Sequence, residues 1–437
     1  MAEFKMITSK HKIGFFTVLA LVIGNTVGNG IFLIPSSLAR FGSISLLGWI
    51  FTSIGVITIA LSYTRLSRMH PAVGGPYAYC RKGFGDYIGF QVAWNYWISN
   101  WTSNAGVVVG LIGYLSICYE PIGSDPMLSF IISVSILWLI TFLNILNIKG
   151  AGNLQVVTTV LKLLPLFALL FFGVGHINIE NFTPFNTTGE THMTAIVGAA
   201  TITMWAFAGF ETGTVPASNV IKPEKTIPRA TLIGTLVTMA VYIGISAIVL
   251  GIIPNCDLVN NAAPIADVGE IVFGPWGKWF ITIGAIVSSI GTLNGLILVQ
   301  AQIPYAAAKD KLFPESFAKT TRSGEPIVAH IVSSLLITTL LIMGFNDNLV
   351  DKYTYIIIFS SLTTLITYLF SVMSEIMFYL QNKEIKKLPK MHVLNAIMAF
   401  VYIIWALYGA GATQVYAGCL LFFISTPLYA YLKYKNP

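Results

Sequence analysis

Long apolar segments recur along the whole chain, and they constrain its fold more than any other feature. A helix that crosses a lipid bilayer needs about 20 mostly apolar residues, because each residue rises about 1.5 Å across a hydrocarbon core of about 30 Å. Segments near that length lie at 13–39, 43–66, 86–118, 127–147, 155–174, 194–219, 229–253, 278–308, 326–345, 351–380, 392–410 and 413–432. We therefore predict an all-α polytopic membrane protein with about 12 transmembrane helices, of which the first is too long for a signal peptide.

Few residues are charged, which agrees with a chain that lies in lipid. Asp, Glu, Lys and Arg make up 10% of the 437 residues, whereas a soluble domain carries about 25%. Together with 55% hydrophobic residues, this deficit excludes a soluble or disordered chain and a nucleic-acid-binding module. The four cysteines and six histidines form neither a CxxC pair nor an intramembrane cluster, so we expect no metal, no cofactor and no enzyme site.

The basic residues lie mostly on one side of the predicted spans. Of the 25 Lys and Arg residues, Arg40, Lys278 and Lys352 lie in one alternating set of loops, Lys162 lies inside a span, and all the others lie in the opposite set. Cytoplasmic loops carry such an excess in membrane proteins. The distribution predicts an even number of spans in an inner or plasma membrane, with both termini in the cytoplasm.

Glycines and polar residues interrupt two of the apolar segments. The interruptions are Gly24-Asn25-Thr26-Val27-Gly28-Asn29-Gly30 in the first segment and Trp205-Ala206-Phe207-Ala208-Gly209-Phe210-Glu211-Thr212-Gly213 in the sixth. Glycine costs about 1 kcal/mol relative to alanine in a helix interior, so each cluster favours a helix break. Close helix packing through small residues is the alternative for either cluster alone. Backbone groups freed by a break must line a cavity or be buried in protein.

The positions of the two breaks predict an internal repeat. Interrupted helices at matching places in two halves of a chain indicate a transporter's binding site. The first and sixth spans are an odd number of spans apart, so the second unit would have inverted topology. We predict a five-plus-five inverted repeat with units at 13–174 and 194–380 and two further helices within 392–432.

The ends of the broken helices indicate a ligand. Free carbonyl groups near Thr26 and Ala208 suit an ammonium group, and free N–H groups near Asn29 and Gly30 suit a carboxylate. A ligand that carries both groups on one carbon is an α-amino acid. The sequence therefore favours an amino acid as the transported substrate.

Four motifs resemble those of the amino acid–polyamine–organocation transporters. They are Gly24-Asn25-x-x-Gly28-x-Gly30, Trp205-x-Phe207-x-Gly209-x-Glu211, Pro71-x-x-Gly74-Gly75-x-Tyr77-x-Tyr79, and Lys309-Asp310 followed by Leu312-Phe313-Pro314. The likeness covers nearly the whole chain and is nearest to the basic amino acid/polyamine antiporter branch, which includes arginine/agmatine antiporters. It implies a LeuT-like fold with broken first and sixth helices.

The resemblance also implies roles for particular residues. The substrate carboxylate would lie near Asn29 and Gly30, and the ammonium near the carbonyl groups of Thr26, Trp205 and Ala208. Trp205 would lie against the substrate, with Glu211 behind it as a proton-linked switch. Further pocket positions would be Asn25, Tyr96, Asn104 and Ser360, and the gating aromatics would be Tyr77, Tyr353 and Tyr368.

The substrate side chain is expected to differ from that of arginine. The sequence has Leu296 where the arginine and putrescine exchangers of this branch carry a second tryptophan. Stacking of a cation on tryptophan contributes about 0.5–2 kcal/mol, so its loss weakens the case for a guanidinium group. Ser99 and Asn100 add hydrogen-bonding groups in the third span, which favours a polar or neutral side chain.

Two ionisable residues lie inside predicted spans. Lys162 in the fifth span is either a lysine that snorkels to the cytoplasmic interface or a functional cation. The resemblance implies the latter, with the ammonium in the place that a sodium ion takes in sodium-coupled relatives. Glu211 in the sixth span either bonds to freed backbone as a neutral carboxyl or controls proton-linked opening, and both roles can hold together.

We expect a secondary active transporter that moves an α-amino acid or related amine by alternating access, as an exchanger. The alternative is a proton-coupled symporter that uses Lys162 in place of sodium. An integral membrane enzyme, a channel and a transporter with parallel six-plus-six halves are less consistent with the paired breaks. The sequence leaves open whether the chain acts alone or as a homodimer.

Overall fold

The computed structural model describes residues 14–28, 30–71, 74–146, 151–214, 220–322, 324–343, 349–382 and 389–435. Within these ranges, 11 helices are long and apolar enough to cross a membrane. A shorter apolar helix of 17 residues, Ile327–Met343, lies where the ninth span was predicted. The described residues thus confirm the all-α polytopic architecture.

The helices follow one another with short connections. Those along the predicted spans are α1 (Phe15–Thr26), α2 (Gly30–Ala39), α3 (Ser45–Met69), α5 (Asp86–Cys118), α7 (Pro126–Ile145), α8 (Ala151–Phe172), α9 (His192–Phe207), α10 (Pro223–Ile252), α13 (Pro275–Lys309), α14 (Ile327–Met343), α15 (Leu349–Gln381), α16 (Lys390–Gly409), α17 (Ala412–Ile424) and α18 (Thr426–Lys435). The short ones are α4 (Pro76–Phe84), α6 (Pro121–Ser124), α11 (Asn255–Leu258), α12 (Pro264–Phe273), η1 (Gly173–His176), η2 (Ile179–Phe182), η3 (Phe210–Thr214) and η5 (Glu315–Ala318).

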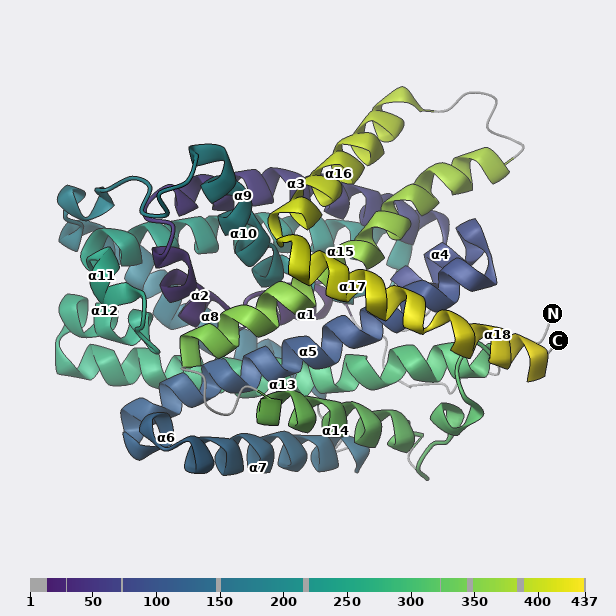
Figure 1. Cartoon of the computed structure of the whole chain (residues 1–437), viewed down its shortest axis with the longest axis horizontal. Coiled ribbons are helices and arrows are strands. Elements are labelled where there is room, and N and C mark those ends of the chain that lie inside the picture. The colour runs from purple at the N-terminus through teal and green to yellow at the C-terminus, as the bar shows by residue number, and fades with distance from the viewer. Residues whose placement is uncertain are drawn as a thin grey trace.

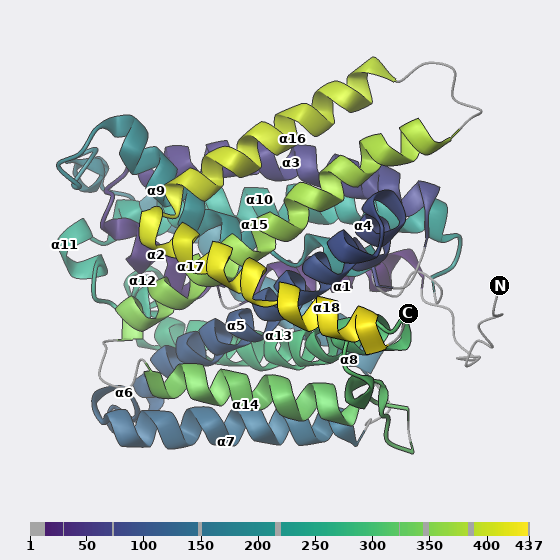
Figure 2. The ribbon, with the colours of Figure 1, turned by 45° about the vertical axis from the view of Figure 1, so that its right-hand side comes forward.

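Two groups of helices pack around a common centre. In one group, α1 and α3 pack on α10, and α3 also packs on α9. In the other group, α5 packs on α13, while α14 packs on α7, α5 and α13; α7 and α14 run side by side along one edge of the molecule (Figures 1 and 2). Helix α15 contacts both groups, through α5 on one side and α3 and α9 on the other. The two groups therefore meet along α1, α9 and α15.

Both predicted helix breaks are present. Helix α1 ends at Thr26, and the N–H of Gly28 turns back to the Thr26 carbonyl at 2.7 Å instead of continuing the helical ladder. The chain resumes as α2 at Gly30. Helix α9 ends at Phe207, Gly209 takes a φ of +117°, and the chain continues as the 3-10 helix η3. Glycine adopts this positive φ without the strain that a side chain would add.

Burial separates the central helices from the peripheral ones. Every residue of α2 is buried, whereas α17 leaves Tyr416, Leu420 and Phe423 exposed. In a bilayer such exposed apolar side chains face lipid or another protein chain, because water is absent from the hydrocarbon core. The broken helices are thus at the centre of the bundle, where freed backbone groups have protein partners.

Candidate functional site: a cavity between two helix breaks

A small cavity lies between the two breaks. It is lined by Asn25, Thr26, Gly28, Gly30, Tyr96, Ser99, Asn100, Ser103, Val107, Trp205, Ala206, Ala208, Gly209, Glu211, Thr212, Thr292, Leu296 and Thr364. Its volume of about 40 Å³ is on the scale of a few water positions. An amino acid therefore needs the surrounding side chains to move apart before it can fit.

The two broken helices approach each other at two glycines. A methyl group added to Gly209 would lie 3.1 Å from the backbone carbonyl carbon and oxygen of Asn25, which is too close for ordinary packing. On the opposite side, a methyl group added to Gly30 would lie 2.8 Å from the ring of Trp205. Glycine at both places therefore lets one broken helix approach the other closely.

Trp205 closes one side of the cavity. Its ring packs edge to face on Tyr353, with a centroid distance of 5.5 Å, and its Nε1–H donates to Ser103 Oγ at 3.0 Å. Ser103 Oγ in turn lies 2.7 Å from Ser360 Oγ, whose hydroxyl donates to the Ser99 carbonyl at 2.9 Å. These contacts fix the indole between α5 and α15.

Glu211 lies at the other side of the cavity and is 2% exposed. Its Oε1 accepts a hydrogen bond from the Tyr96 hydroxyl at 3.0 Å. Its Oε2 accepts from the Tyr368 hydroxyl at 2.7 Å and from the Gly209 N–H at 3.0 Å. The carboxyl group therefore joins the break in α9 to α5 and α15, and it does bond to freed backbone.

Lys162 is fully buried, with an exposure of 0%. Its Nζ donates to the Gly24 carbonyl and lies 3.4 Å from Thr292 Oγ1 on α13. Gly24 is in the last turn of α1, where carbonyl groups have no helical donor, so the ammonium supplies the missing partner. The snorkelling alternative is wrong, because the amine points to the helix break and does not reach the surface.

Tyr242 on α10 bridges the two breaks. Its hydroxyl lies 2.5 Å from the Thr26 carbonyl oxygen and 2.9 Å from the Ala206 carbonyl oxygen. The Thr26 carbonyl also accepts the Gly28 N–H. A carbonyl oxygen has two lone pairs, so two donors already surround the group that was expected to hold a substrate ammonium. Sequence reasoning missed Tyr242, which stands in an otherwise apolar stretch.

The structure gathers most of the predicted site residues at the cavity. Those that line it are Asn25, Thr26, Gly30, Tyr96, Ser99, Asn100, Trp205, Ala208, Glu211 and Leu296. Ser360, Tyr353, Tyr368 and Lys162 lie behind this lining, each bonded to or packed on a lining residue or its broken helix. Asn29 lies outside the described residues. Ser103, Thr212, Thr292 and Thr364 also line the cavity. Thr212 is part of the predicted second break, whereas the other three are single hydroxyl residues on long helices and gave no sequence signal.

Two predicted residues lie away from the cavity lining. Asn104 donates to Gln300 Oε1 at 2.7 Å and so joins α5 to α13. Tyr77, on α4, donates to Asp310 Oδ2 at 2.7 Å. Burial and this acidic neighbour raise the pKa of Tyr77 above its usual value, so the phenol stays a donor. Neither residue can touch a substrate in this arrangement.

Ion pairs join helices at the end of the molecule that carries most basic residues. Arg81 on α4 bonds to Asp310 after α13 at 2.6 Å and to Asp86 on α5 at 2.9 Å. Lys433 on α18 bonds to Asp86 at 2.7 Å. The two carboxylates raise the pKa of Arg81 against the opposing effect of its partial burial. Together with Tyr77, these contacts tie α4, α5, α13 and α18 to one another.

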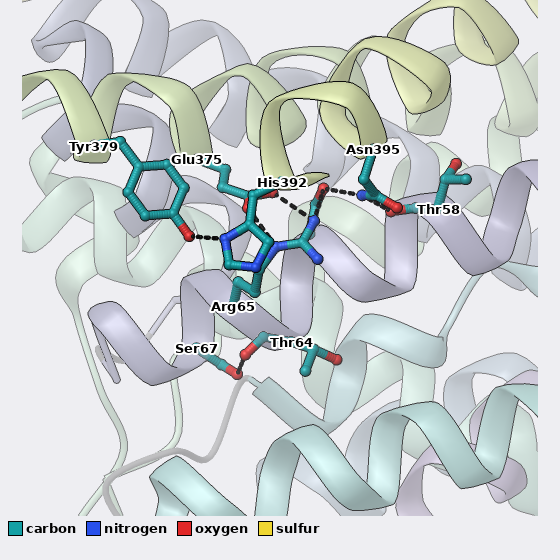
Figure 3. A network of polar contacts seen from close by, with 9 residues as sticks. Thr58, Thr64, Arg65, Ser67, Glu375, Tyr379, His392 and Asn395 are labelled. Carbon is teal, nitrogen blue, oxygen red and sulfur yellow. Dashed lines mark hydrogen bonds and ion pairs between the residues drawn. The ribbon is translucent and has the colours of Figure 1, made fainter. Parts of the chain in front are cut away.

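A second network links α3, α15 and α16 (Figure 3). Glu375 on α15 is bonded by Arg65 Nε and, at 3.0 Å, by Arg65 Nη2. Asn395 donates to the Thr58 carbonyl at 2.9 Å, and Tyr379 lies 2.7 Å from His392 Nδ1.

At the opposite end, Arg40 pairs with Asp351, and Ser37 Oγ lies 2.7 Å from Thr354 Oγ1. Polar contacts therefore close the bundle at both ends.

Comparisons with known proteins agree with this geometry. A family model described as amino acid permease matches residues 13–430. A Bacillus subtilis protein named as an arginine/ornithine antiporter is 30% identical over 97% of each chain. The arginine/ornithine antiporter of Pseudomonas aeruginosa is 28% identical, covering 98% of this chain and 92% of its own. The cadaverine/lysine antiporter of Escherichia coli is 28% identical over 97% and 95%. This chain, with its two broken helices around a central cavity, belongs to the amino acid permease family.

Proposed function

We propose that this protein is a secondary active antiporter that exchanges an α-amino acid for another amino acid or a related amine. The observation that carries the proposal is the cavity bounded by both helix breaks. The start of α2 offers N–H groups without helical acceptors, and the ends of α1 and α9 offer carbonyl groups without helical donors. The names of the relatives support exchange and do not favour proton symport.

The α-carboxylate of the substrate would bind at the start of α2, at Gly30 and the preceding Asn29. The ammonium would bind near the Ala208 carbonyl and take the place of the Tyr242 hydroxyl at Thr26. Trp205 would then lie against the substrate, because its ring already packs on Gly30. Asn25, whose Nδ2 donates to Thr212 at 3.1 Å, holds the two breaks together beside this site.

Alternating access would come from motion of the two helix groups against each other. Trp205 with Tyr353, together with the Arg40–Asp351 pair, would close the outer side. Glu211 with its two tyrosines, and the Asp310 contacts, would close the cytoplasmic side. Protonation of Glu211 would turn a group that accepts three hydrogen bonds into one that also donates, which weakens the contacts between η3, α5 and α15.

For the substrate side chain we favour a polar or neutral group. Leu296 and Val107 line the cavity beside Ser99, Asn100 and Thr364, and Glu211 is the acidic side chain among the described lining residues. That carboxylate is already bonded by three donors. A cationic side chain would have to compete for it without a second tryptophan for stacking.

The direct test is uptake into proteoliposomes. The full chain would be loaded with one amino acid and offered a panel of labelled amino acids and amines, including arginine, ornithine and lysine, with and without a pH gradient. We expect uptake that requires internal substrate and proceeds without the gradient. Uptake driven by the gradient into empty vesicles would indicate symport, and no saturable uptake of any compound would refute the transport proposal.

Trp205→Ala tests the location of the substrate. It should raise the half-saturation concentration at least about tenfold, because aromatic packing and burial together contribute a few kcal/mol. Trp276→Ala is a matched control, since Trp276 is largely exposed on α13. An unchanged half-saturation concentration in a folded Trp205→Ala protein would exclude contact between this ring and the substrate.

The cytoplasmic location of both termini is part of the proposal, as is residence in the inner or plasma membrane. Its basis is the distribution of Lys and Arg over the alternating loops. A protein with Cys256 as its one cysteine should react with a membrane-impermeant maleimide in intact cells, because Cys256 is exposed in a predicted outer loop. Ser316→Cys in the same background should react only after the membrane is opened, and the reverse pattern would invert the topology.

Crosslinking in membranes would show whether the chain acts alone or as a homodimer.

A further inference from the structure

A second hollow lies at the end of α13, far along the chain from the helix breaks. It measures about 690 Å³ and is lined by Lys309, Pro314, Glu315, Ser316, Ala318, Lys319, Leu428, Tyr431, Leu432 and Lys435. Figures 1 and 2 show α18 reaching the same end of the molecule as the end of α13. Pockets of about 300–1,000 Å³ hold small organic ligands, so this groove has the size of a binding site.

The groove is positively charged. Lys309, Lys319 and Lys435 line it together with one acidic residue, Glu315. None of the ion pairs in the described part of the chain involves these three lysines, whereas Lys433 on the same helix α18 is paired with Asp86. Three ammonium groups opposed by one carboxylate favour an anionic ligand.

One wall of the groove is apolar and continues toward the lipid-facing surface. Leu432 is 4% exposed and packs in a cluster that contains Leu312 and Phe313. Just before α18, Phe423 and Ile424 are exposed on α17. Tyr431, at the mouth of the groove, is 60% exposed, and tyrosine is common at the level of lipid headgroups. The groove therefore lies where apolar surface gives way to charged surface.

Hydrogen bonds fix both walls in place. Helix α13 ends in a paired C-terminal motif, in which Leu312 N–H donates to the Ala307 carbonyl at 2.8 Å and Lys311 N–H to the Ala308 carbonyl at 3.0 Å. Lys311 has the left-handed φ of 62° that this motif requires. On the other wall, the Lys433–Asp86 bond ties α18 to α5. The lysines of the groove thus project from anchored backbone.

We propose that this groove binds the headgroup of an anionic phospholipid from the cytoplasmic leaflet, with an acyl chain along Leu428 and Leu432. Basic pockets beside membrane helices on the cytoplasmic side recognise such headgroups. The apolar wall and the adjoining lipid-facing side chains favour a lipid over a soluble anion. Residues 1–13 contain Lys5, Lys10 and Lys12, so charge repulsion disfavours them as the occupant. The inference relies on the proposed orientation but not on transport.

The test is native mass spectrometry of the purified full chain in micelles that contain phosphatidylglycerol and acyl-matched phosphatidylcholine in equal amounts. We expect one phosphatidylglycerol to be retained per chain in preference to phosphatidylcholine. The triple variant Lys309→Gln/Lys319→Gln/Lys435→Gln should bind it at least about tenfold more weakly, since each lysine near a lipid headgroup contributes about 1 kcal/mol.

A matched variant separates the groove from general surface charge. Lys222→Gln/Lys225→Gln/Lys390→Gln removes the same charge from exposed positions of the same predicted face and should leave retention unchanged. Equal losses in the two triple variants would overturn the proposal, as would equal retention of the two lipids. Displacement by glycerol 3-phosphate at millimolar concentration would also overturn it, because the groove would then be a site for a soluble anion. Thermal unfolding of each variant verifies that it is folded.

Discussion

Lys162 and Glu211 are both buried ionisable groups at a helix break, but their partners are of different kinds. Lys162 donates to the main-chain carbonyl of Gly24, with Thr292 at a longer 3.4 Å. Glu211 accepts from one main-chain N–H and from two tyrosine side chains. Lys162 thus completes the end of α1, whereas Glu211 joins the break in α9 to α5 and α15. Loss of the lysine should damage the site itself, and loss of the carboxylate should mainly alter the contact between helices.

The largest expected effect is that of Lys162→Met, which tests the first half of this contrast. A buried carbonyl that loses a charged donor costs about 1–3 kcal/mol, so the initial rate of exchange should fall by about 10- to 100-fold. The remaining activity should depend little on pH. Exchange rates across a pH series in proteoliposomes measure both effects. A wild-type pH profile would show that Lys162 is only structural.

Glu211→Gln should have a smaller effect. The amide keeps one acceptor oxygen for a tyrosine, but its NH₂ group faces a donor where the carboxylate had an oxygen. We expect exchange to slow by about tenfold. If Glu211→Gln reduced exchange more than Lys162→Met, the contrast would be reversed: Glu211 would maintain the site, and Lys162 would mainly affect the contact between helices.

The two tyrosines sharpen the role of Glu211. Tyr368→Phe removes the 2.7 Å bond and Tyr96→Phe the 3.0 Å bond, and each should change the exchange rate by about three- to tenfold, since bonds to charged groups contribute about 1.5–3 kcal/mol before the second tyrosine compensates. The double variant should slow exchange no more than Glu211→Gln does, and its free-energy effect should be smaller than the sum of the two single effects. Additive single and double effects would mean that the tyrosines act separately from the carboxylate.

Thr292→Val should have the smallest effect. The hydroxyl lies 3.4 Å from Lys162 Nζ, near the limit for a hydrogen bond, and valine fills the same space. We expect less than about a twofold change in exchange rate. A loss as large as that of Lys162→Met would make Thr292 a main partner of the Lys162 amine. Lys162 would then depend on a side-chain hydrogen bond, as Glu211 does.

The sequence predicted the helices and the two breaks because both depend on local composition. Runs of about 20 apolar residues exclude soluble alternatives, and the glycines at 24–30 and 209–213 weaken helices regardless of context. The units 13–174 and 194–380 of the repeat stay predictions. Trp205 and Glu211 were recognisable as site residues because the motif around the second break resembles that of the transporter family.

Other parts of the site depend on packing and were not predictable. Tyr242, Ser103 and Thr292 reach the site from three separate helices, and hydroxyl residues are common in membrane helices of many kinds. The partner of Lys162 was not predictable from the sequence, since any of several carbonyl groups at the end of α1 could have accepted the bond. Asn104 resembled a pocket residue, and only its bond to Gln300 shows that its amide nitrogen is directed between helices.

The Tyr242 hydroxyl carries one hydrogen atom and lies within bonding distance of two carbonyl oxygens, one from each broken helix. A single hydrogen can bond strongly to one of them at a time, so α1 and α9 share a donor that is insufficient for both. An ammonium group has three hydrogens and could serve both oxygens together. Substrate would then supply the hydrogen bonds that the protein lacks, and binding would draw the two broken helices into a common geometry.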